Sequence, residues 1–421
     1  MELPKNMDFI KSYLKNINKT VLQNYIYLLL IQIANFVLPL IALPYLVITL
    51  NTEGYGLVMI AQSLAVFLGI LVDFGFNISA TREVSILRDN KEALSRYFSN
   101  VYAIKIGLIV LAFLFLAILI AFVPKFQSDP EVYFLSFGIV IGQAIFPTWF
   151  FQGIEKMRII TIINVVAKAF FTISIFFFIL SPEDYLMAPI LNSLGMIISG
   201  ALGLFYCFRF VRFTKPNFGE MKAMVVESSS LMVSNFAVNL YTYANTLILG
   251  LMWGDSLAGI YASMEKLVLA IKSVYAPLYQ AIFPFLAAKK KPQIVGIIKQ
   301  LSIPISIFGV FATAVLLGSA SVFLDFIYGN QEISSYSSIF RILSFIAIFS
   351  ALNMLLVTLY LPSIKEYKLR MKILSFAGLL HLMLVVSMSH FYDIYGVAIT
   401  ASFTELLILL IAYFYFKKTI E

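Results

Sequence analysis

Twelve apolar segments, each long enough to cross a bilayer as a helix, follow one another along the 421-residue chain. Such a crossing takes about 20 residues. Several polar connections between the segments are very short, for example 51–54 and 253–255, so neighbouring helices must run antiparallel. We therefore predict an all-α polytopic membrane protein with twelve transmembrane helices and no inserted soluble domain. The predicted spans are 22–50, 55–80, 97–122, 131–153, 158–180, 185–209, 224–251, 256–287, 297–324, 336–361, 370–390 and 394–416.

The composition excludes a soluble fold of this length. Hydrophobic residues make up 61% of the chain and charged residues 12%, and the mean hydropathy is +0.92. Soluble domains carry about 25% charged residues, and a globular fold of this size could not bury so much apolar surface. The one cysteine, Cys207, excludes an intramolecular disulfide.

Lysine and arginine residues gather on one side of the predicted bundle. Of the 30 basic residues, 24 fall in the N-terminal segment, the C-terminal end and the loops of that side, whereas the opposite loops contain only Lys125. This side therefore faces the cytoplasm, together with both termini. The first 20 residues are polar and basic, so we expect a cytoplasmic surface segment rather than a cleaved signal peptide. Anchoring near anionic headgroups explains the net charge of +8 without a nucleic-acid partner.

A polar stretch in the middle of the chain divides it into two sets of six spans. This stretch, RFVRFTKPNFGEMK at 209–222, is the longest connection on the cytoplasmic side. Because each half holds an even number of spans, both halves enter the membrane from the same side, as parallel repeats do. A weak sequence similarity between the hairpins of spans 1–2 and 7–8 supports this interpretation. We predict a cytoplasmic N-terminal segment at 1–21, an N-lobe at 22–210, a cytoplasmic linker at 211–223 and a C-lobe at 224–421.

Three stretches of the chain carry a resemblance to a known family. They are 50–88, 146–160 and 228–266, and their most specific element is WFFQGIEKM at Trp149–Met157. Together they resemble the polysaccharide-unit flippases, the O-antigen (Wzx-type) translocases of the multidrug/oligosaccharidyl-lipid/polysaccharide exporter superfamily. The resemblance covers nearly the whole chain, since the length and the twelve spans agree as well.

The resemblance implies a fold and a substrate class. The fold is two six-helix lobes that face each other across a V-shaped cavity. The substrate is an undecaprenyl-pyrophosphate-linked oligosaccharide, an O-antigen or capsule repeat unit, moved by alternating access across the bacterial cytoplasmic (inner) membrane. Membrane lipid, a polysaccharide polymerase and chain-length proteins are the partners expected with it. The family offers no catalytic motif to transfer.

Five basic residues lie inside the predicted spans. Moving an anionic pyrophosphate through hydrocarbon requires a polar path, and buried lysines suit phosphate as point charges. We predict that these five residues line a cationic cavity. Pairing with acids on neighbouring helices is the alternative for the lysines of spans 5 and 8, and extension of the side chain to the membrane surface is the alternative for the other two residues. The five are Lys105, Lys168, Lys266, Lys272 and Arg341.

Span 8 carries three of the charges, and helical geometry separates them. Lys266 and Lys272 are six residues apart, about 120° around a helix, so they can border one wide cavity but cannot point at one spot. Glu265 and Lys272 are seven residues apart and share a face. The span therefore offers one Glu/Lys face and a separate Lys266 face.

Three acidic residues in the spans are candidates for charge pairing or for carrying a coupling proton or sodium ion. They are Glu265, Asp73 and Glu405. Asparagine-rich faces also occur, and their side chains either bind sugar or link helices. These faces contain Asn35, Asn235, Asn239 and Asn245.

The sequence contains no pairing of a nucleophile with a base, no metal-ligand spacing and no phosphate-cradling glycine motif. We therefore expect neither an enzyme nor a metal site, and no cofactor. A drug/cation antiporter of the same superfamily is the main alternative, and its cavity should favour acids. A polysaccharide polymerase or ligase should carry a large outer loop with basic residues, whereas the outer side here has only Lys125. A scaffold for a glycan-assembly complex does not account for the charges within the spans.

Overall fold

The computed structural model describes residues 19–275, 278–279, 282–283, 286 and 289–420. These residues form helices and short connections, and none of them lies in a strand. The elements of the first half are α2 (Lys19–Asp73), α3 (Phe76–Leu87), α4 (Lys91–Phe122), α5 (Pro124–Gln127), α6 (Pro130–Ile145), α7 (Thr148–Gly153), α8 (Met157–Phe178), the 3₁₀ turn η1 (Pro182–Leu186) and α9 (Met187–Cys207). Those of the second half are α10 (Phe218–Trp253), α11 (Asp255–Ser273), α13 (Lys291–Tyr328), α14 (Gln331–Ser335), α15 (Ser337–Asn353), the π-helical η2 (Met354–Tyr360), α16 (Leu361–Ser363) and α17 (Tyr367–Ile420).

Eight helical segments of the described chain are long and apolar enough to cross a membrane. Two of them, Val37–Leu87 and Tyr367–Lys418, contain 51 and 52 residues. Each contains a break in the helical backbone, at Asn51 in α2 and at Tyr392–Asp393 in α17, where the sequence predicts a short connection. Helices α10 and α11 are not among the eight, and they carry several of the polar side chains described below. The multi-pass helical class is thus confirmed, and the number of twelve spans stays a prediction.

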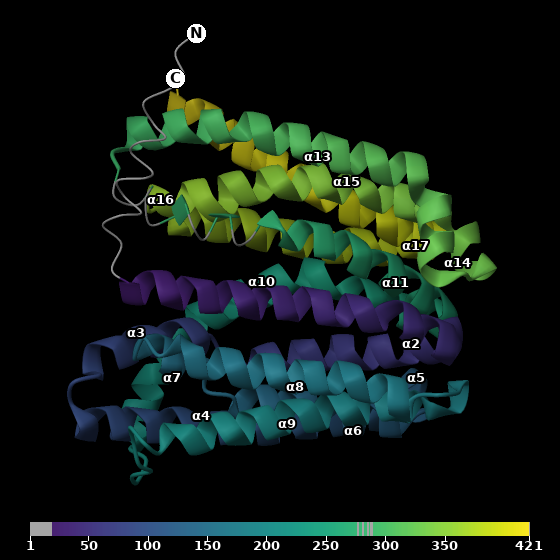
Figure 1. The fold of residues 1–421 in the computed structure, drawn as a ribbon. Coiled ribbons are helices and arrows are strands. Elements are labelled where there is room, and N and C mark those ends of the chain that lie inside the picture. The colour runs from purple at the N-terminus through teal and green to yellow at the C-terminus, as the bar shows by residue number, and fades with distance from the viewer. Residues whose placement is uncertain (1–18, 276–277, 280–281, 284–285, 287–288, 421) are drawn as a thin grey trace.

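The helices of the two sequence halves occupy different sides of the molecule. The second part of α2 and α3 to α9 lie on one side and α13 to α17 on the other, with α10, α11 and the first part of α2 between them (Figure 1). Helix α11 packs against α2, and α10 packs against both α2 and α17. The bend of α2 lies at the same end as α5 and α14, whereas α3, α7 and α16 lie at the opposite end (Figure 1). The predicted outer loops therefore gather at one end of the bundle.

Helices α2 and α11 cross at a pair of glycines. A Cβ atom on Gly56 would lie 1.8 Å from the carbonyl oxygen of Asp255, and one on Gly259 would lie 2.0 Å from the carbonyl oxygen of Thr52. Only glycine, which lacks a Cβ atom, permits backbones to approach this closely. The contact is reciprocal. Gly56 meets Asp255, four residues before Gly259, and Gly259 meets Thr52, four residues before Gly56. Reciprocal contacts of this kind are typical of two-fold related pairs.

Two backbone conformations recur at corresponding places in the two halves. Asn51 (φ 58, ψ 172) precedes the second part of α2, and Gly254 (φ 93, ψ 177) precedes α11. Glu155 (φ 58) and Lys365 (φ 65) follow the short helices α7 and α16. In both of these turns the amide of the positive-φ residue donates to the carbonyl three residues earlier, and the next amide donates to the carbonyl five residues earlier. The two halves thus share local backbone geometry in addition to their weak sequence similarity.

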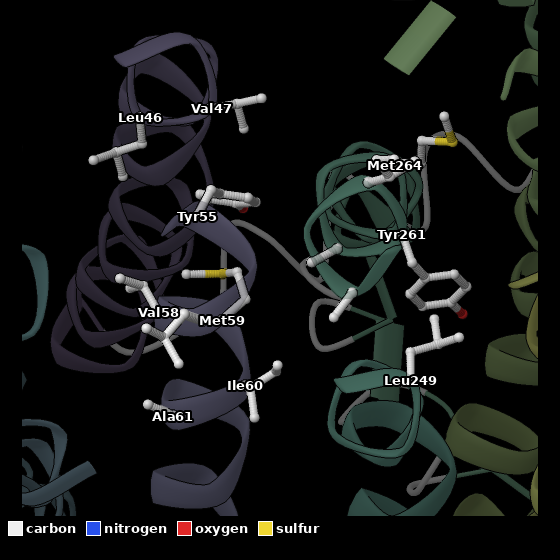
Figure 2. Packing of buried hydrophobic residues seen from close by; sticks show 14 of the residues in the cluster. Leu46, Val47, Tyr55, Val58, Met59, Ile60, Ala61, Leu249, Tyr261 and Met264 are labelled. Atoms are coloured by element: carbon white, nitrogen blue, oxygen red, sulfur yellow. The ribbon is translucent and has the colours of Figure 1, made fainter. Parts of the chain in front are cut away.

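Apolar side chains fill the contact between α2 and α11. Figure 2 shows side chains of α2 facing those of α10 and α11 across this contact. Large apolar side chains also cover the outside of the bundle, for example Phe177, Phe311 and Phe414, which are 71%, 65% and 66% exposed. Such a surface suits contact with lipid rather than with water. The labelled side chains of Figure 2 are Leu46, Val47, Tyr55, Val58, Met59, Ile60, Ala61, Leu249, Tyr261 and Met264.

The WFFQGIEKM element acts as a packing anchor. Trp149, Phe150 and Phe151 are fully buried. The ring centroid of Phe98 on α4 lies 5.7 Å from that of Trp149 and 5.3 Å from that of Phe150. None of these four side chains lines a cavity described below. The most specific part of the family resemblance therefore fixes α7 against α4 and does not itself contact a cavity.

Candidate functional site

A cavity of about 250 Å³ lies among α2, α6, α8 and α9, with α11 closing one side. Two lysines and four carboxamide side chains face it, in addition to apolar groups and two hydroxyls. Among the described residues that line it, none is acidic. We name this space the lysine cavity. Its polar lining consists of Lys168, Lys266, Gln62, Gln143, Asn164, Asn192, Thr172 and Ser199.

Lys168 stands in a polar row on α8, a helix that is otherwise largely apolar. Asn164 and Thr172 lie one turn before and one turn after it, and all three side chains line the lysine cavity. In the part of the chain that the structure describes, Lys168 has no hydrogen-bond or ion-pair partner. The alternative interpretation of Lys168, a pair with an acid such as Asp73 or Glu265, is therefore not seen among these contacts. An ammonium group without a counter-charge inside the bundle is suited to an anionic ligand.

Lys266 reaches the same cavity from α11. Its Nζ atom donates to the sulfur of Met59 over 2.7 Å and lies 5.5 Å from the ring centroid of Tyr55. Both residues belong to α2, so this lysine extends from the second half of the chain toward the first. Its contacts are a weak acceptor and an aromatic face, which leave the ammonium group open to a stronger anionic partner.

A second cavity, of about 270 Å³, adjoins the first and shares Gln143, Asn164 and Met196 with it. Lys105 and Asp73 lie in its wall, with 3.5 Å between Nζ and Oδ1. The Lys105 side chain is only 2% exposed, whereas that of Asp73 is 21% exposed. Lys105 thus faces inward and pairs with an acid instead of extending to the membrane surface.

Helix α11 presents its charges to two different places. Lys266 faces the lysine cavity, whereas Glu265 and Lys272 border a separate space of about 30 Å³ between α10, α11, α15 and α17. This separation agrees with the angle expected from the six-residue and seven-residue spacings. The two faces predicted for span 8 thus border two different cavities.

The charge of Lys272 is neutralised inside the second half of the chain. Its Nζ atom donates to Oε1 of Glu405 over 2.5 Å, and the amide of Asn353 donates to Oε2 of the same carboxylate over 2.6 Å. The Glu405 side chain is 7% exposed. Because the carboxylate neutralises it, Lys272 does not present a free cation to a substrate, and removal of either partner would leave a buried charge unpaired.

Glu265 belongs to a hydrogen-bonded chain of neutral groups. Its Oε1 atom accepts from the amide of Asn245 over 3.1 Å, and its Oε2 atom lies 3.5 Å from the hydroxyl of Thr246. The oxygen of Asn245 lies 3.0 Å from Nε2 of His381, whose Nδ1 lies 2.8 Å from the hydroxyl of Thr404. This chain connects α11, α10 and α17. Asn245 therefore links helices.

The remaining predicted candidates lie elsewhere. Arg341 on α15 is exposed and does not line any of the described cavities. The amide of Asn239 donates to the carbonyl of Asn235 within α10 over 2.7 Å. The side chain of Asn35 lies outside the described residues. Within the described ranges, no group of His, Cys, Asp and Glu side chains could hold a metal ion.

Polar contacts join the two halves at the end that holds α5 and α14. Lys125 Nζ lies 2.6 Å from Oδ2 of Asp255. Glu332 accepts a hydrogen bond from Thr52 over 2.8 Å and another from Ser256 over 3.0 Å. We name these five residues the outer latch. They join α2 and α5 to α11 and α14, so the two halves are held together at this end.

The opposite end also has contacts between the halves. Asn100 and Arg96 on α4 bond to the carboxylate of Glu220 on α10, over 2.7 Å and 3.4 Å. The hydroxyls of Ser79 on α3 and Ser228 on α10 lie 2.8 Å apart. Arg82 and Glu227 on the same helices form an ion pair at 3.8 Å, and both side chains are largely exposed. Contacts between the halves thus occur at both ends of the bundle.

Sequence reasoning missed the carboxamides that line the lysine cavity. It singled out asparagines of spans 1 and 7, whereas the cavity uses Gln62, Gln143, Asn164 and Asn192. An available signal was the isolated polar residue within an apolar span. That signal does not distinguish a side chain that faces a cavity from one that bonds to a neighbouring helix.

A multi-pass helical fold with charged and polar cavities among its helices is typical of membrane transporters. The chain belongs to the polysaccharide biosynthesis protein family, which matches residues 21–289. The family-level resemblance stated from the sequence is thereby confirmed.

Two curated relatives, each named "Putative O-antigen transporter", match almost the whole chain. The protein from Escherichia coli (strain K12) is 27% identical over 402 residues, which cover 93% of this chain and 96% of the relative. The protein from Shigella dysenteriae is 28% identical over 395 residues, with coverage of 92% and 98%. Both relatives are named as transporters, which fits the expectation that this chain is not an enzyme.

Solved structures show the same fold. The inward-facing conformation of a multidrug resistance MATE family transporter of the MOP superfamily superposes with a TM-score of 0.70 at 13% identity, covering 90% of this chain and 94% of that one. The lipid II flippase MurJ in an inward closed conformation superposes with a TM-score of 0.61 at 16% identity, covering 92% and 87%.

Proposed function

We propose that the chain is a flippase that moves an undecaprenyl-pyrophosphate-linked polysaccharide repeat unit across the bacterial cytoplasmic membrane. The long polyprenyl tail remains in lipid throughout, while the anionic and sugar-bearing head passes through the protein. The names of the two curated relatives support this substrate class. A polysaccharide polymerase and chain-length proteins are the partners that we expect to act on the delivered unit.

The lysine cavity is the observation that carries the proposal. It presents Lys168 and Lys266 without an acidic residue in its described lining, and so it suits an anion. A drug/cation antiporter needs the opposite sign in its binding site. We therefore favour the flippase over the antiporter, although both share the fold.

We propose that transport works by alternating access between two six-helix lobes with twelve spans in total and both termini in the cytoplasm. The reciprocal crossing of Gly56 and Gly259 and the recurring turns support two related lobes. The outer latch closes the end that we assign to the periplasm. Opening toward the periplasm requires these contacts to separate, whereas the contact between Ser79 and Ser228 separates when the cytoplasmic end opens.

Coupling to a proton or sodium ion is part of the proposal, with Glu265 as the carrier. Of the three predicted acids, Asp73 and Glu405 each pair with a lysine. The hydrogen-bond partners of Glu265, in contrast, are neutral among the described residues. Its carboxylate can therefore take up a cation without breaking an ion pair.

Reconstitution of the purified chain tests the proposed function. In liposomes, undecaprenyl-pyrophosphoryl N-acetylglucosamine of the inner leaflet is expected to become accessible to a membrane-impermeant galactosyltransferase added outside, because the protein supplies a polar path for the head. Protein-free liposomes should expose only the lipid that started in the outer leaflet. Accumulation of a cationic dye by the same proteoliposomes, with no change in lipid accessibility, would instead support the antiporter.

A disulfide across the outer latch tests alternating access. The hydroxyl oxygens of Thr52 and Ser256 lie 3.1 Å apart, so a Thr52→Cys/Ser256→Cys variant should form a disulfide under oxidising conditions. We expect oxidation to stop lipid translocation in proportion to the cross-linked fraction, and a reductant to restore it. The single variant Thr52→Cys is the control, and the buried native Cys207 should not interfere. Full transport by completely cross-linked protein would refute the requirement for this end to open.

A further inference from the structure

Four carboxamide side chains around the lysine cavity have unused hydrogen-bonding capacity. In the described part of the protein, Gln62, Gln143, Asn164 and Asn192 form no hydrogen bonds with other residues. The Oδ1 atom of Asn164 is completely buried and still lacks a partner. Buried polar atoms are nearly always bonded, because an unsatisfied group loses the hydrogen bonds of water without replacement. Asn164 is such a group, and the other three carboxamides face the same space without a described protein partner, so a polar ligand can complete all four.

These carboxamides all belong to the first half of the chain and lie beside the cations. Gln62 is on α2, Gln143 on α6, Asn164 on α8 and Asn192 on α9. Asn164 lies one helical turn from Lys168 on the same face. Gln143 and Asn164 also line the adjoining cavity, so the amide groups continue beyond the two lysines. The arrangement places a cationic region next to a region of neutral donors and acceptors.

Gly69 on α2 has no side chain, and this leaves room for the amide of Gln143. A Cβ atom on Gly69 would lie 2.7 Å from Oε1 of Gln143, which is closer than such contacts allow. The Gln143 side chain is exposed to the space shared by the two cavities. Its position therefore depends on a glycine two helical turns beyond Gln62.

The chemistry of a carboxamide limits the ligand. Each carboxamide has an oxygen that accepts and a nitrogen that donates two hydrogen bonds. Phosphate oxygens accept bonds from lysine and from amide nitrogen, but they cannot satisfy amide oxygens. The ligand must therefore combine an anionic group with hydroxyl or N–H donors. A sugar joined to a phosphate meets both requirements, whereas a sugar-free pyrophosphate meets only the first.

We infer that Gln62, Gln143, Asn164 and Asn192 form a subsite for the sugar residue that is joined to the pyrophosphate, beside the phosphate site at Lys168 and Lys266. This inference rests on the proposed function and adds to it a place where the glycan is recognised. The first half of the chain thus selects the sugar, while the asparagines of the second half are used in helix contacts.

Two lipids that differ only in the sugar separate this subsite from the phosphate site. Purified protein is titrated with undecaprenyl pyrophosphate and with undecaprenyl-pyrophosphoryl N-acetylglucosamine, and the bound fraction is measured by native mass spectrometry. Wild-type protein should bind the sugar-bearing lipid more tightly. Asn164→Leu and Gln143→Met should each lower the affinity for the sugar-bearing lipid roughly 3- to 10-fold, the range for a lost neutral hydrogen bond. The affinity for the sugar-free lipid should change less than about 2-fold, since the amides contribute little to the binding of pyrophosphate.

The design has matched controls. Gln127→Met makes the same chemical change at an exposed position of α5, outside the cavities, and should alter neither affinity. Lys168→Met should weaken both lipids alike, because both carry the pyrophosphate. Gly69→Ala displaces the Gln143 amide without removing it and should reproduce the selective loss. This last variant keeps the test decisive if a direct substitution prevents folding.

The possible outcomes distinguish two failures. Equal wild-type affinity for the two lipids, or an equal loss of both in the carboxamide variants, would overturn the sugar subsite while leaving the flippase proposal intact. Failure of wild-type protein to bind either lipid would instead overturn the proposed function. Selective loss of the sugar-bearing lipid in Asn164→Leu, Gln143→Met and Gly69→Ala supports the subsite.

Discussion

A variant with Lys168→Glu and Lys266→Glu should export almost no surface glycan when it replaces the transporter of a flippase-deficient strain. Both lysines line the same cavity, and no acidic residue stands beside them in its described lining. Charge reversal converts an attraction for pyrophosphate into a repulsion. Loss of one charged contact to a desolvated partner costs about 2 kcal/mol or more, which is roughly 30-fold in affinity. Reversal at two positions should exceed this by a wide margin.

Surface glycan, normalised to the protein level in the membrane, is the measurement for this prediction. Lys215→Glu, a reversal in the exposed linker between the halves, is the matched control and should export normally. Lys168→Arg keeps the charge and should retain part of the activity, because the larger guanidinium group fits phosphate with a different geometry. Normal export by the double reversal variant at a normal protein level would rule out the lysine cavity as the path of the head group.

The second large effect concerns stability rather than transport. Lys272→Met should destabilise the protein by about 3–5 kcal/mol, the usual cost of leaving one partner of a buried ion pair without its counter-charge. The partner left behind is Glu405, whose side chain is 7% exposed and keeps one hydrogen bond, from the amide of Asn353 to Oε2. Thermal unfolding of the detergent-purified protein measures the loss, and the amount of protein in the membrane should fall with it.

A double variant decides whether this pair only stabilises the fold. Lys272→Met/Glu405→Gln removes both charges and keeps an acceptor for Asn353, so it should regain most of the lost stability. If the pair is structural, the double variant should also export glycan. A double variant that is stable but inactive would assign Glu405 or Lys272 a role in the transport cycle. Unchanged stability of Lys272→Met alone would contradict the ion-pair interpretation.

The contrast between Lys266 and Lys272 shows how far helical periodicity leads. Their spacing correctly predicted that they cannot point at one spot, because the angle between two side chains on one helix depends only on their separation. It could not predict that Lys266 would find a sulfur and an aromatic ring while Lys272 would find a carboxylate. These partners belong to α2 and α17, and sequence spacing carries no information about which helix packs against each face.

The asparagines also show that the sequence does not reveal which helix a side chain contacts. The sequence left two interpretations for Asn245, sugar binding or a link between helices, and its bond to His381, 136 residues away, supports the second. Asn164 and Asn192 look alike in the sequence and have no such partner among the described residues. The amide of Asn245 is bonded because α10 packs against α17. Asn164 and Asn192 instead face the cavity that lies between α8 and α9.

The sequence by itself determined the membrane class and the family, because these depend on composition, segment length and local motifs. It also determined that span 8 has two charged faces, since neighbouring residues on one helix have a fixed geometry. The tertiary structure alone decided which charges are neutralised and which face a cavity. Lys105 meets Asp73 across 32 residues and Lys272 meets Glu405 across 133, whereas Lys168 meets no acid in the described chain. Pairing in the low-dielectric interior depends on distances between helices, and these distances are fixed only when the helices pack.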